Sequence, residues 1–147
     1  MPSVITLPRP SRLEPHLLIN FRLILLLVTV LAIFGLSGCR TAMVREYQNQ
    51  PVPPGLKIGD VGKAIHNAGN SLGWAMEQKH EGLIVGTLYI RTHMAKVEIP
   101  YSSTSYSIIY KDSTNLKYDA ENKTIHSNYD GWIQNLNNQI RSRLYSR

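Results

Sequence analysis

Two kinds of side chain in this sequence are suited to chemistry: a single thiol and a small set of histidines. Cys39 is the only cysteine in the 147 residues, which excludes an internal disulfide, a CxxC redox pair and a multi-cysteine metal site. Ser37 and Gly38 come directly before it, at the end of an apolar run. Such small residues let a protease approach the backbone closely, and a thiolate is a strong nucleophile. The sequence therefore predicts a processing and modification site at this cysteine.

Four histidines follow the cysteine, at positions 66, 80, 93 and 126. None lies in an HExxH motif and no two are three or four residues apart, so we expect no metal site and no cofactor. Arg91 and His93 flank a predicted strand junction, and His126 precedes the last predicted helix. Two interpretations of this polar group stay open. Its members bond to backbone groups at strand ends, or they share one polar cluster.

Three tyrosines, Tyr101, Tyr106 and Tyr110, accompany this group at strand positions. Tyrosines in strands mostly pack in a core or on the sheet surface. Alternatively they form an aromatic floor for a glycan or a partner peptide. The predicted binding surface consists of these tyrosines with Arg91, His93 and His126.

No catalytic motif accompanies these residues. A GxSxG elbow is missing. Ser107 or Ser113 can be drawn into a triad with Asp112 and His126, but serine is common and the order proves nothing. The stretch 112–115 is better explained as a turn, because short polar side chains bond to nearby backbone groups. We therefore expect no catalytic residue.

The stretch before the cysteine has the order of a secretory signal. Arg9, Arg12 and Arg22 come first, and an apolar run over residues 23–36 follows. A membrane-spanning helix needs about 20 apolar residues, which this run does not reach. We expect residues 1–38 to be a removed signal peptide, and an uncleaved anchor helix is the alternative.

The four residues Leu36-Ser37-Gly38-Cys39 resemble the lipobox of bacterial lipoproteins. The resemblance implies cleavage between Gly38 and Cys39 and lipidation of Cys39. Two or more acyl chains then anchor a protein stably in a membrane. Arg40, where an aspartate would retain the protein, favours the outer membrane by resemblance to the sorting rule of Gram-negative lipoproteins. The folded part is then expected to face the periplasm.

The net charge of +6 does not indicate a nucleic-acid partner. Three of the 16 Lys and Arg residues lie in residues 1–38, and the others are scattered. Proteins that bind nucleic acid usually gather basic residues in a stripe beside base-stacking aromatic residues. We therefore expect no nucleic-acid binding.

The remaining chain divides into a linker and one domain. Residues 39–56 are expected to be the lipidated cysteine and a flexible tether, because Pro51, Pro53 and Pro54 disfavour a sheet ladder. Residues 57–147 are expected to form a single domain.

A helix is predicted from Asp60, which can cap it, to a point between Lys79 and Gly82. Trp74 lies outside the apolar stripe of this helix and is expected to be partly exposed. The apolar face of the helix is made of Val61, Ile65, Ala68, Leu72, Ala75 and Met76.

Alternating apolar residues predict strands over 83–90, 93–101 and 105–111, joined by short connections into an antiparallel meander. A small hairpin of 116–118 with 124–126 can extend it. The last helix is predicted to begin at Ser127, which forms a capping box with Asp130. The fold class is therefore a two-layer α+β domain: an N-terminal helix, an antiparallel meander of three to five strands and a C-terminal helix, with both helices on one face.

Three segments, residues 91–97, 106–116 and 125–136, resemble in order and spacing a group of small proteobacterial lipoproteins of uncharacterised function. The resemblance covers about residues 60–145. It implies a small α+β domain and no activity.

The predicted function is that of a lipid-anchored envelope accessory protein without catalytic activity. It would bind a partner protein or an envelope polymer through the open sheet face or an exposed strand edge. The alternative is a small periplasmic hydrolase centred on His93 and His126, with Asp112 or Arg91. That alternative requires the two histidines to converge at one site.

Overall fold

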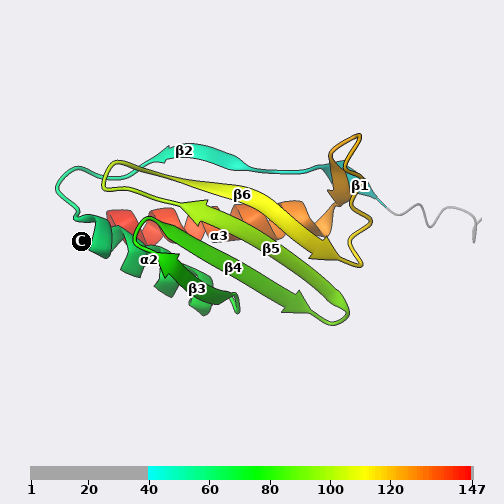
Figure 1. The fold of residues 1–147 in the computed structure, drawn as a ribbon, viewed down its shortest axis with the longest axis horizontal. Helices are drawn as coiled ribbons and strands as arrows, with labels where there is room; N and C mark the ends of the chain where they lie inside the picture. The colour runs from blue at the N-terminus through cyan, green and yellow to red at the C-terminus, as the bar shows by residue number, and fades with distance from the viewer. Residues whose placement is uncertain (1–39, 147) are drawn as a thin grey trace, which may run out of the picture. The chain divides into compact units, whose positions relative to one another are not determined.

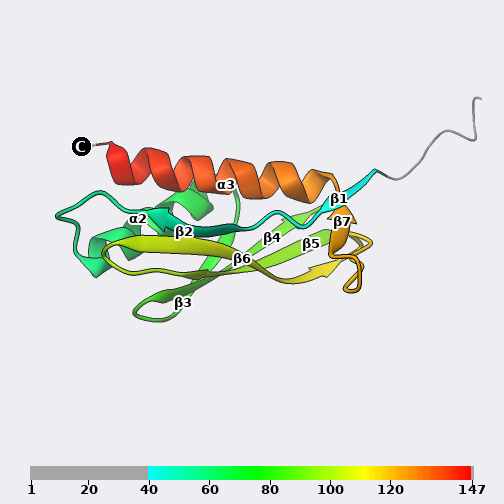
Figure 2. The ribbon, with the colours of Figure 1, turned by 90° about the horizontal axis from the view of Figure 1, so that it is seen from above.

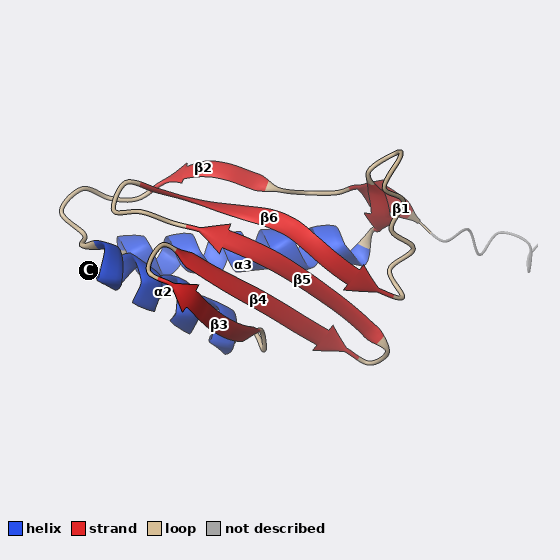
Figure 3. Ribbon diagram, in the orientation of Figure 1, coloured by secondary structure: helices blue, strands red, loops and turns tan. Residues whose placement is uncertain are grey.

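An antiparallel sheet of five strands is the framework of the fold (Figure 1, Figure 3). The computed structural model describes residues 40–146, so the predicted signal peptide, its cleavage site and Cys39 lie outside the described residues. The sheet order is β2-β6-β5-β4-β3. Its strands are β2 (Tyr47–Pro51), β3 (Ala75–His80), β4 (Leu83–Ile90), β5 (His93–Pro100) and β6 (Ser105–Thr114).

Two helices cover one face of this sheet. Figure 1 views the sheet from its uncovered face, with α2 (Ile58–Ser71) and α3 (Asn128–Tyr145) behind it. Figure 2 shows the same two layers from above. A second, two-stranded sheet pairs β1 (Thr41–Met43) with β7 (Thr124–His126). The predicted α+β class, with both helices on one face of an antiparallel meander, is confirmed. Within residues 40–146, neither helix is long and apolar enough to cross a membrane.

The core lies between the helices and the sheet. Alternate residues of β5 point inward and are fully buried, because successive side chains of a strand point to opposite faces. The helices contribute residues at spacings of three and four, which places them on one side of each helix. The core includes Val61, Ile65 and Ala68 of α2, Ile84 and Leu88 of β4, Ala95, Val97 and Ile99 of β5, Tyr106 and Ile108 of β6, and Ile133, Leu136 and Ile140 of α3.

The first helix ends much earlier than the predicted region of Lys79 to Gly82. Gly73 has a φ of +82°, a conformation that glycine adopts without steric cost. The Trp74 N–H donates to the Gly69 carbonyl at 3.0 Å, and the Gly73 N–H donates to the Asn70 carbonyl at 3.1 Å. These are the two hydrogen bonds of a Schellman motif, which closes a helix. The chain beyond it forms β3, and Trp74 is buried rather than partly exposed.

Residues 41–51 differ from the tether that was expected over residues 39–56. β1 begins at Thr41, and β2 pairs with β6 at the outer edge of the large sheet. Pro51 is tolerated because it is the last residue of an edge strand. Val52 follows it into the core, and its N–H donates to the Thr104 carbonyl at 2.9 Å. This stretch is therefore part of the folded unit.

Smaller differences concern the region before α3. Residues Asp112 to Thr114 continue β6 instead of forming a turn. Thr124–His126 pairs with β1 rather than forming a regular hairpin with residues 116–118. Ser127 precedes α3 but makes no side-chain cap hydrogen bond. Its expected partner Asp130 forms an ion pair with Arg45 instead.

Candidate functional site

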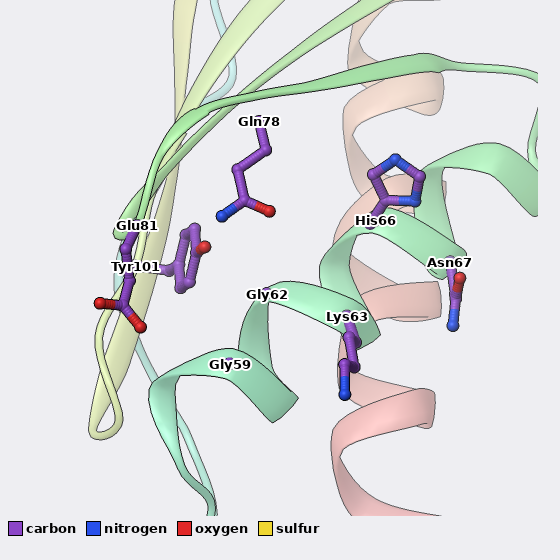
Figure 4. Close-up of a pocket in the computed structure, with 8 residues that line it drawn as sticks. All are labelled: Gly59, Gly62, Lys63, His66, Asn67, Gln78, Glu81 and Tyr101. Carbon is purple, nitrogen blue, oxygen red and sulfur yellow. The ribbon is translucent and has the colours of Figure 1, made fainter.

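A cleft of about 410 Å³ opens between α2 and one end of the sheet (Figure 4). The sheet side is formed by residues at the ends of β3 and β5 and in the β3–β4 turn. The helix side is formed by α2 residues between Gly59 and Asn67. The lining residues are Gly59, Gly62, Lys63, His66, Asn67, Gln78, Glu81 and Tyr101.

Tyr101 is positioned by a glycine on the facing helix. A Cβ atom at Gly62 would lie 2.7 Å from the Tyr101 hydroxyl and about 3 Å from its ring, closer than side chains pack. The Tyr101 N–H also donates to the Gly82 carbonyl at 2.8 Å, which fixes the end of β5 against the β3–β4 turn. Only 7% of Tyr101 is exposed, and the ring borders the cleft between the two layers (Figure 4).

The other polar groups of the cleft offer donors and acceptors of both signs. Lys63 and Glu81 are exposed and bear opposite formal charges on opposite sides of the cleft. Gln78 extends from β3 into the space between Tyr101 and His66 (Figure 4). His66 Nδ1 lies 3.0 Å from the Asn70 amide nitrogen, which leaves its Nε2 available to a ligand. This set suits hydrogen bonding to a peptide-like molecule.

The outer edge of β3 runs beside this cleft. In the part of the chain that the structure describes, no strand pairs with that edge, because β3 is the last strand of the sheet. Most of its residues, Glu77 and Lys79 among them, are exposed. Unpaired backbone N–H and C=O groups along such an edge can accept an additional strand.

His93 and His126, two members of the predicted polar cluster, lie together at the opposite end of the sheet. Their ring centroids are 6.2 Å apart and the rings are roughly parallel. His93 Nδ1 contacts the Asn115 carbonyl at 2.8 Å, so Nδ1 must donate, and in the neutral ring Nε2 is then an acceptor. His126 Nδ1 accepts from the Asn128 N–H at 3.2 Å, so in the neutral ring the proton lies on Nε2. Both histidines therefore also bond to backbone, as the alternative interpretation expected.

Arg91 is close to this pair in the chain but belongs to a turn. It occupies the two-residue connection between β4 and β5, with a φ of +55° and an exposed side chain. The next residue, Thr92, accepts a hydrogen bond from the Asn115 amide through its backbone carbonyl, at 2.7 Å. The turn is thus held to Asn115, the residue after β6, and the His93 ring is bonded to the same residue.

The three tyrosines do not form the shared aromatic floor that was one expectation. Tyr106 is buried, and its hydroxyl donates to Asn137 Oδ1 of α3 at 2.7 Å. Tyr110 stacks on Tyr118 with centroids 4.4 Å apart, and its hydroxyl is 2.9 Å from Ser113 Oγ. Burial raises the pKa of both phenols. Tyr101 and Tyr106 are partners in a β-bridge and both border a second cleft of about 290 Å³, whereas Tyr110 lies farther along β6. The predicted binding surface is therefore divided between this end of the sheet and the end that carries Arg91, His93 and His126.

The triad drawn from sequence is not assembled. Ser107 Oγ accepts the Asn49 N–H at 3.0 Å, and Ser113 Oγ bonds to Tyr110. Asp112 Oδ1 accepts the Ser113 N–H at 2.7 Å. Among residues 40–146 no hydrogen bond joins Asp112 to either histidine of the pair, and no group of three or more His, Cys, Asp or Glu side chains is placed to hold a metal.

Sequence reasoning missed every cleft residue except Tyr101. Lys63, His66 and Asn67 look like the solvated face of an amphipathic helix, which carries no sign of a ligand. Gln78 and Glu81 fell in the part of the chain that was assigned to that helix. The available signal was Gly73, whose place after the helix would have moved both residues into a strand and a turn.

Comparison with known proteins gives no relative for this chain. No family model, no curated protein and no solved structure matches it.

Proposed function

We propose that this protein is a lipid-anchored envelope protein that binds an extended segment of a partner protein along the outer edge of β3. The observation that carries the proposal is the unpaired edge of β3 beside the cleft of about 410 Å³. A strand edge supplies backbone hydrogen bonds and a neighbouring cleft supplies side-chain selectivity, which is how strand addition combines affinity with specificity.

The alternation of a strand decides how such a segment would lie. Successive side chains of an added strand point to opposite faces of the sheet. Those on the helix side would follow Gln78 toward α2 and enter the cleft. There they would meet Tyr101 and the side chains of Lys63 and Glu81. Side chains on the other face would stay in solvent beside the Lys79–Glu77 ion pair, whose atoms are 2.6 Å apart.

The envelope location rests on the lipobox-like sequence that ends at Cys39, and on Arg40 for the outer membrane. An acylated Cys39 would hold the binding domain at the periplasmic surface of a membrane. Partners that share this surface would then be met at high effective concentration.

Site-specific photo-crosslinking in intact cells tests the partner site. A photoreactive residue at Lys79 on the β3 edge should give a discrete protein adduct. The matched probe at Lys96, on the central strand β5 and the uncovered sheet face, should give none. An adduct at Lys96 alone would indicate that the partner binds the open sheet face. The absence of any protein adduct at Lys79 would contradict the proposal.

The second candidate function is a small periplasmic hydrolase. The 6.2 Å separation of His93 and His126 favours it, because one ring presents an acceptor Nε2 and the other a donor Nε2. Hydrolysis of a panel of ester and amide substrates that is abolished by His93→Gln, and retained by His66→Gln, would support this candidate. Equal activity of both variants and wild type would end it.

A further inference from the structure

The start of the folded unit lies very close to the proposed lipid. Thr41 pairs with His126, and the Ser127 N–H donates to the Arg40 carbonyl at 3.0 Å. Two extended residues span at most about 7 Å, so Thr41, the first residue of β1, lies within that distance of the Cys39 Cα atom, and His126 of β7 is its partner. A domain so close to its acyl chains cannot swing freely, and one particular end of it must lie nearest the membrane.

Hydrogen bonds join the other loops of this end to β1 and β7. The Val44 N–H donates to the Lys123 carbonyl at 2.8 Å, which ties the β6–β7 loop to the chain after β1. His93 and the Thr92 carbonyl both bond to Asn115, which ties the β4–β5 turn to the start of that loop. Figures 1 and 2 both show β1, the β4–β5 turn and the β6–β7 loop at the end opposite the C-terminus.

The surface of this end has the composition of a membrane contact. It carries four of the six large hydrophobic side chains that are exposed in the described chain. They are Met43 (66% exposed), Tyr89 (70%), Ile90 (36%) and Tyr118 (39%). Tyrosines with a wet hydroxyl and an apolar ring suit the level of the lipid headgroups.

The same end also carries basic residues. Arg40 precedes β1, Arg91 lies in the β4–β5 turn, and Lys123 lies in the β6–β7 loop together with the acidic residues Asp119 and Glu121. Asp119 is occupied by its own loop: it accepts the N–H groups of Glu121 and Asn122 and the Asn122 amide. Lys and Arg near a surface with anionic lipids contribute attraction of about 1 kcal/mol each.

We infer that this end, formed by β1, the β4–β5 turn and the β6–β7 loop, rests on the membrane with its basic residues against anionic lipid headgroups. The inference rests on the proposed lipidation of Cys39. The strands of the large sheet run from this end to the other (Figure 1), so the contact points the cleft and the adjoining end of β3 away from the bilayer. His93 and His126 lie at the membrane side.

Spin-label depth measurements on the full mature protein test the orientation. Because lipidation of Cys39 would consume the only native thiol, a cysteine introduced by Thr92→Cys or Ser103→Cys would be the single site for a nitroxide. Thr92 lies in the β4–β5 turn, and Ser103 lies in the exposed β5–β6 connection at the opposite end. The labelled proteins are reconstituted in vesicles of phosphatidylcholine with phosphatidylglycerol.

The label at position 92 should be protected from a water-soluble nickel chelate, and the label at position 103 should be fully accessible. Arg91→Glu with Lys123→Glu, or vesicles of phosphatidylcholine alone, should reduce the protection at position 92. Equal accessibility of the two labels in protein whose intact mass includes the acyl chains would overturn the orientation alone. Protein without acyl mass would overturn the anchor, and the orientation with it.

Discussion

Two buried tyrosines, Tyr106 and Tyr129, differ in whether their hydroxyl groups form a hydrogen bond. Tyr106 donates its hydroxyl to Asn137, so two polar groups are satisfied between the sheet and α3. Tyr129 is fully buried, and its hydroxyl finds no hydrogen-bond partner among the described residues. A buried donor without a partner keeps its desolvation cost, whereas a paired one offsets it.

Removing the Tyr106 hydroxyl and removing the Tyr129 hydroxyl should therefore change the free energy of unfolding by different amounts or in opposite directions. Tyr106→Phe leaves the Asn137 oxygen buried without its donor, and should lower the free energy of unfolding by about 1–3 kcal/mol. Tyr129→Phe removes an unpaired hydroxyl and should cause no loss. Urea unfolding of both variants beside wild type measures the difference. A larger loss for Tyr129→Phe would show that its hydroxyl is bonded.

Residue patterns predicted some of the site and could not predict the rest. The order of the chain suggested that His93 and His126 are close, but the contact depends on β7, which pairs with β1 in a second sheet. The different surroundings of the Tyr106 and Tyr101 hydroxyls depend on Asn137 and Gly62, which lie on different helices. No local pattern reports which distant residue a side chain will meet.

Gly73 decides the arrangement of the elements. Its left-handed conformation ends α2 and turns the chain into β3, which provides the proposed docking edge. Without this turn, Ala75 and Met76 continue the apolar periodicity of the helix, which is why the sequence pattern alone extended the helix through β3.

Gly73→Ala should lower the free energy of unfolding by about 1–2 kcal/mol, because an L-residue pays that cost in the left-handed region. Gly131→Ala, in α3, is the matched control. Its Cβ would meet nothing within 4 Å, and alanine favours a helix by up to about 1 kcal/mol over glycine. Thermal unfolding should rank Gly131→Ala above Gly73→Ala, and the reverse order would refute the role given to Gly73.

Element types were predictable where packing and local preference agree. β4 and β5 are rich in apolar residues at alternating positions, and the strands were found at nearly their observed bounds. β3 contains Glu77, Gln78 and Lys79, residues that rarely favour strands, and it exists because β4 pairs with it. β2 likewise depends on pairing with β6, a long-range contact that Pro51 conceals in the sequence.

At the scale of the whole molecule, buried phenols make stability depend on alkaline pH. Burial raises the pKa of Tyr106 and Tyr129 above the ordinary value of 10.0. The folded state therefore keeps protons that the unfolded state releases, so this contribution to stability is complete below pH 10 and is lost as pH rises beyond it. Above pH 10, each of the two phenols should lower the free energy of unfolding by about 1.4 kcal/mol per pH unit.

Urea unfolding at a series of alkaline pH values measures this loss. The unfolding midpoint of the wild type should fall steeply above pH 10, and that of a Tyr106→Phe, Tyr129→Phe variant should fall less. A midpoint with the same pH dependence in both proteins would show that these two phenols do not control alkaline unfolding.

Both the proposed envelope partner and the proposed membrane-facing end require that Cys39 carries a lipid. The first strand, β1, begins at Thr41, so close to Cys39 in the chain that a lipid there would fix the orientation of the domain. The cleft beside β3 would then face the periplasm.

The intact mass of protein extracted from membranes, measured beside a Cys39→Ala variant, tests this claim most directly. The account predicts that the wild type begins at residue 39 and carries added acyl mass, and that the variant carries none. A wild-type protein that retains residues 1–38 and no lipid would contradict it, and would make the apolar run an uncleaved anchor.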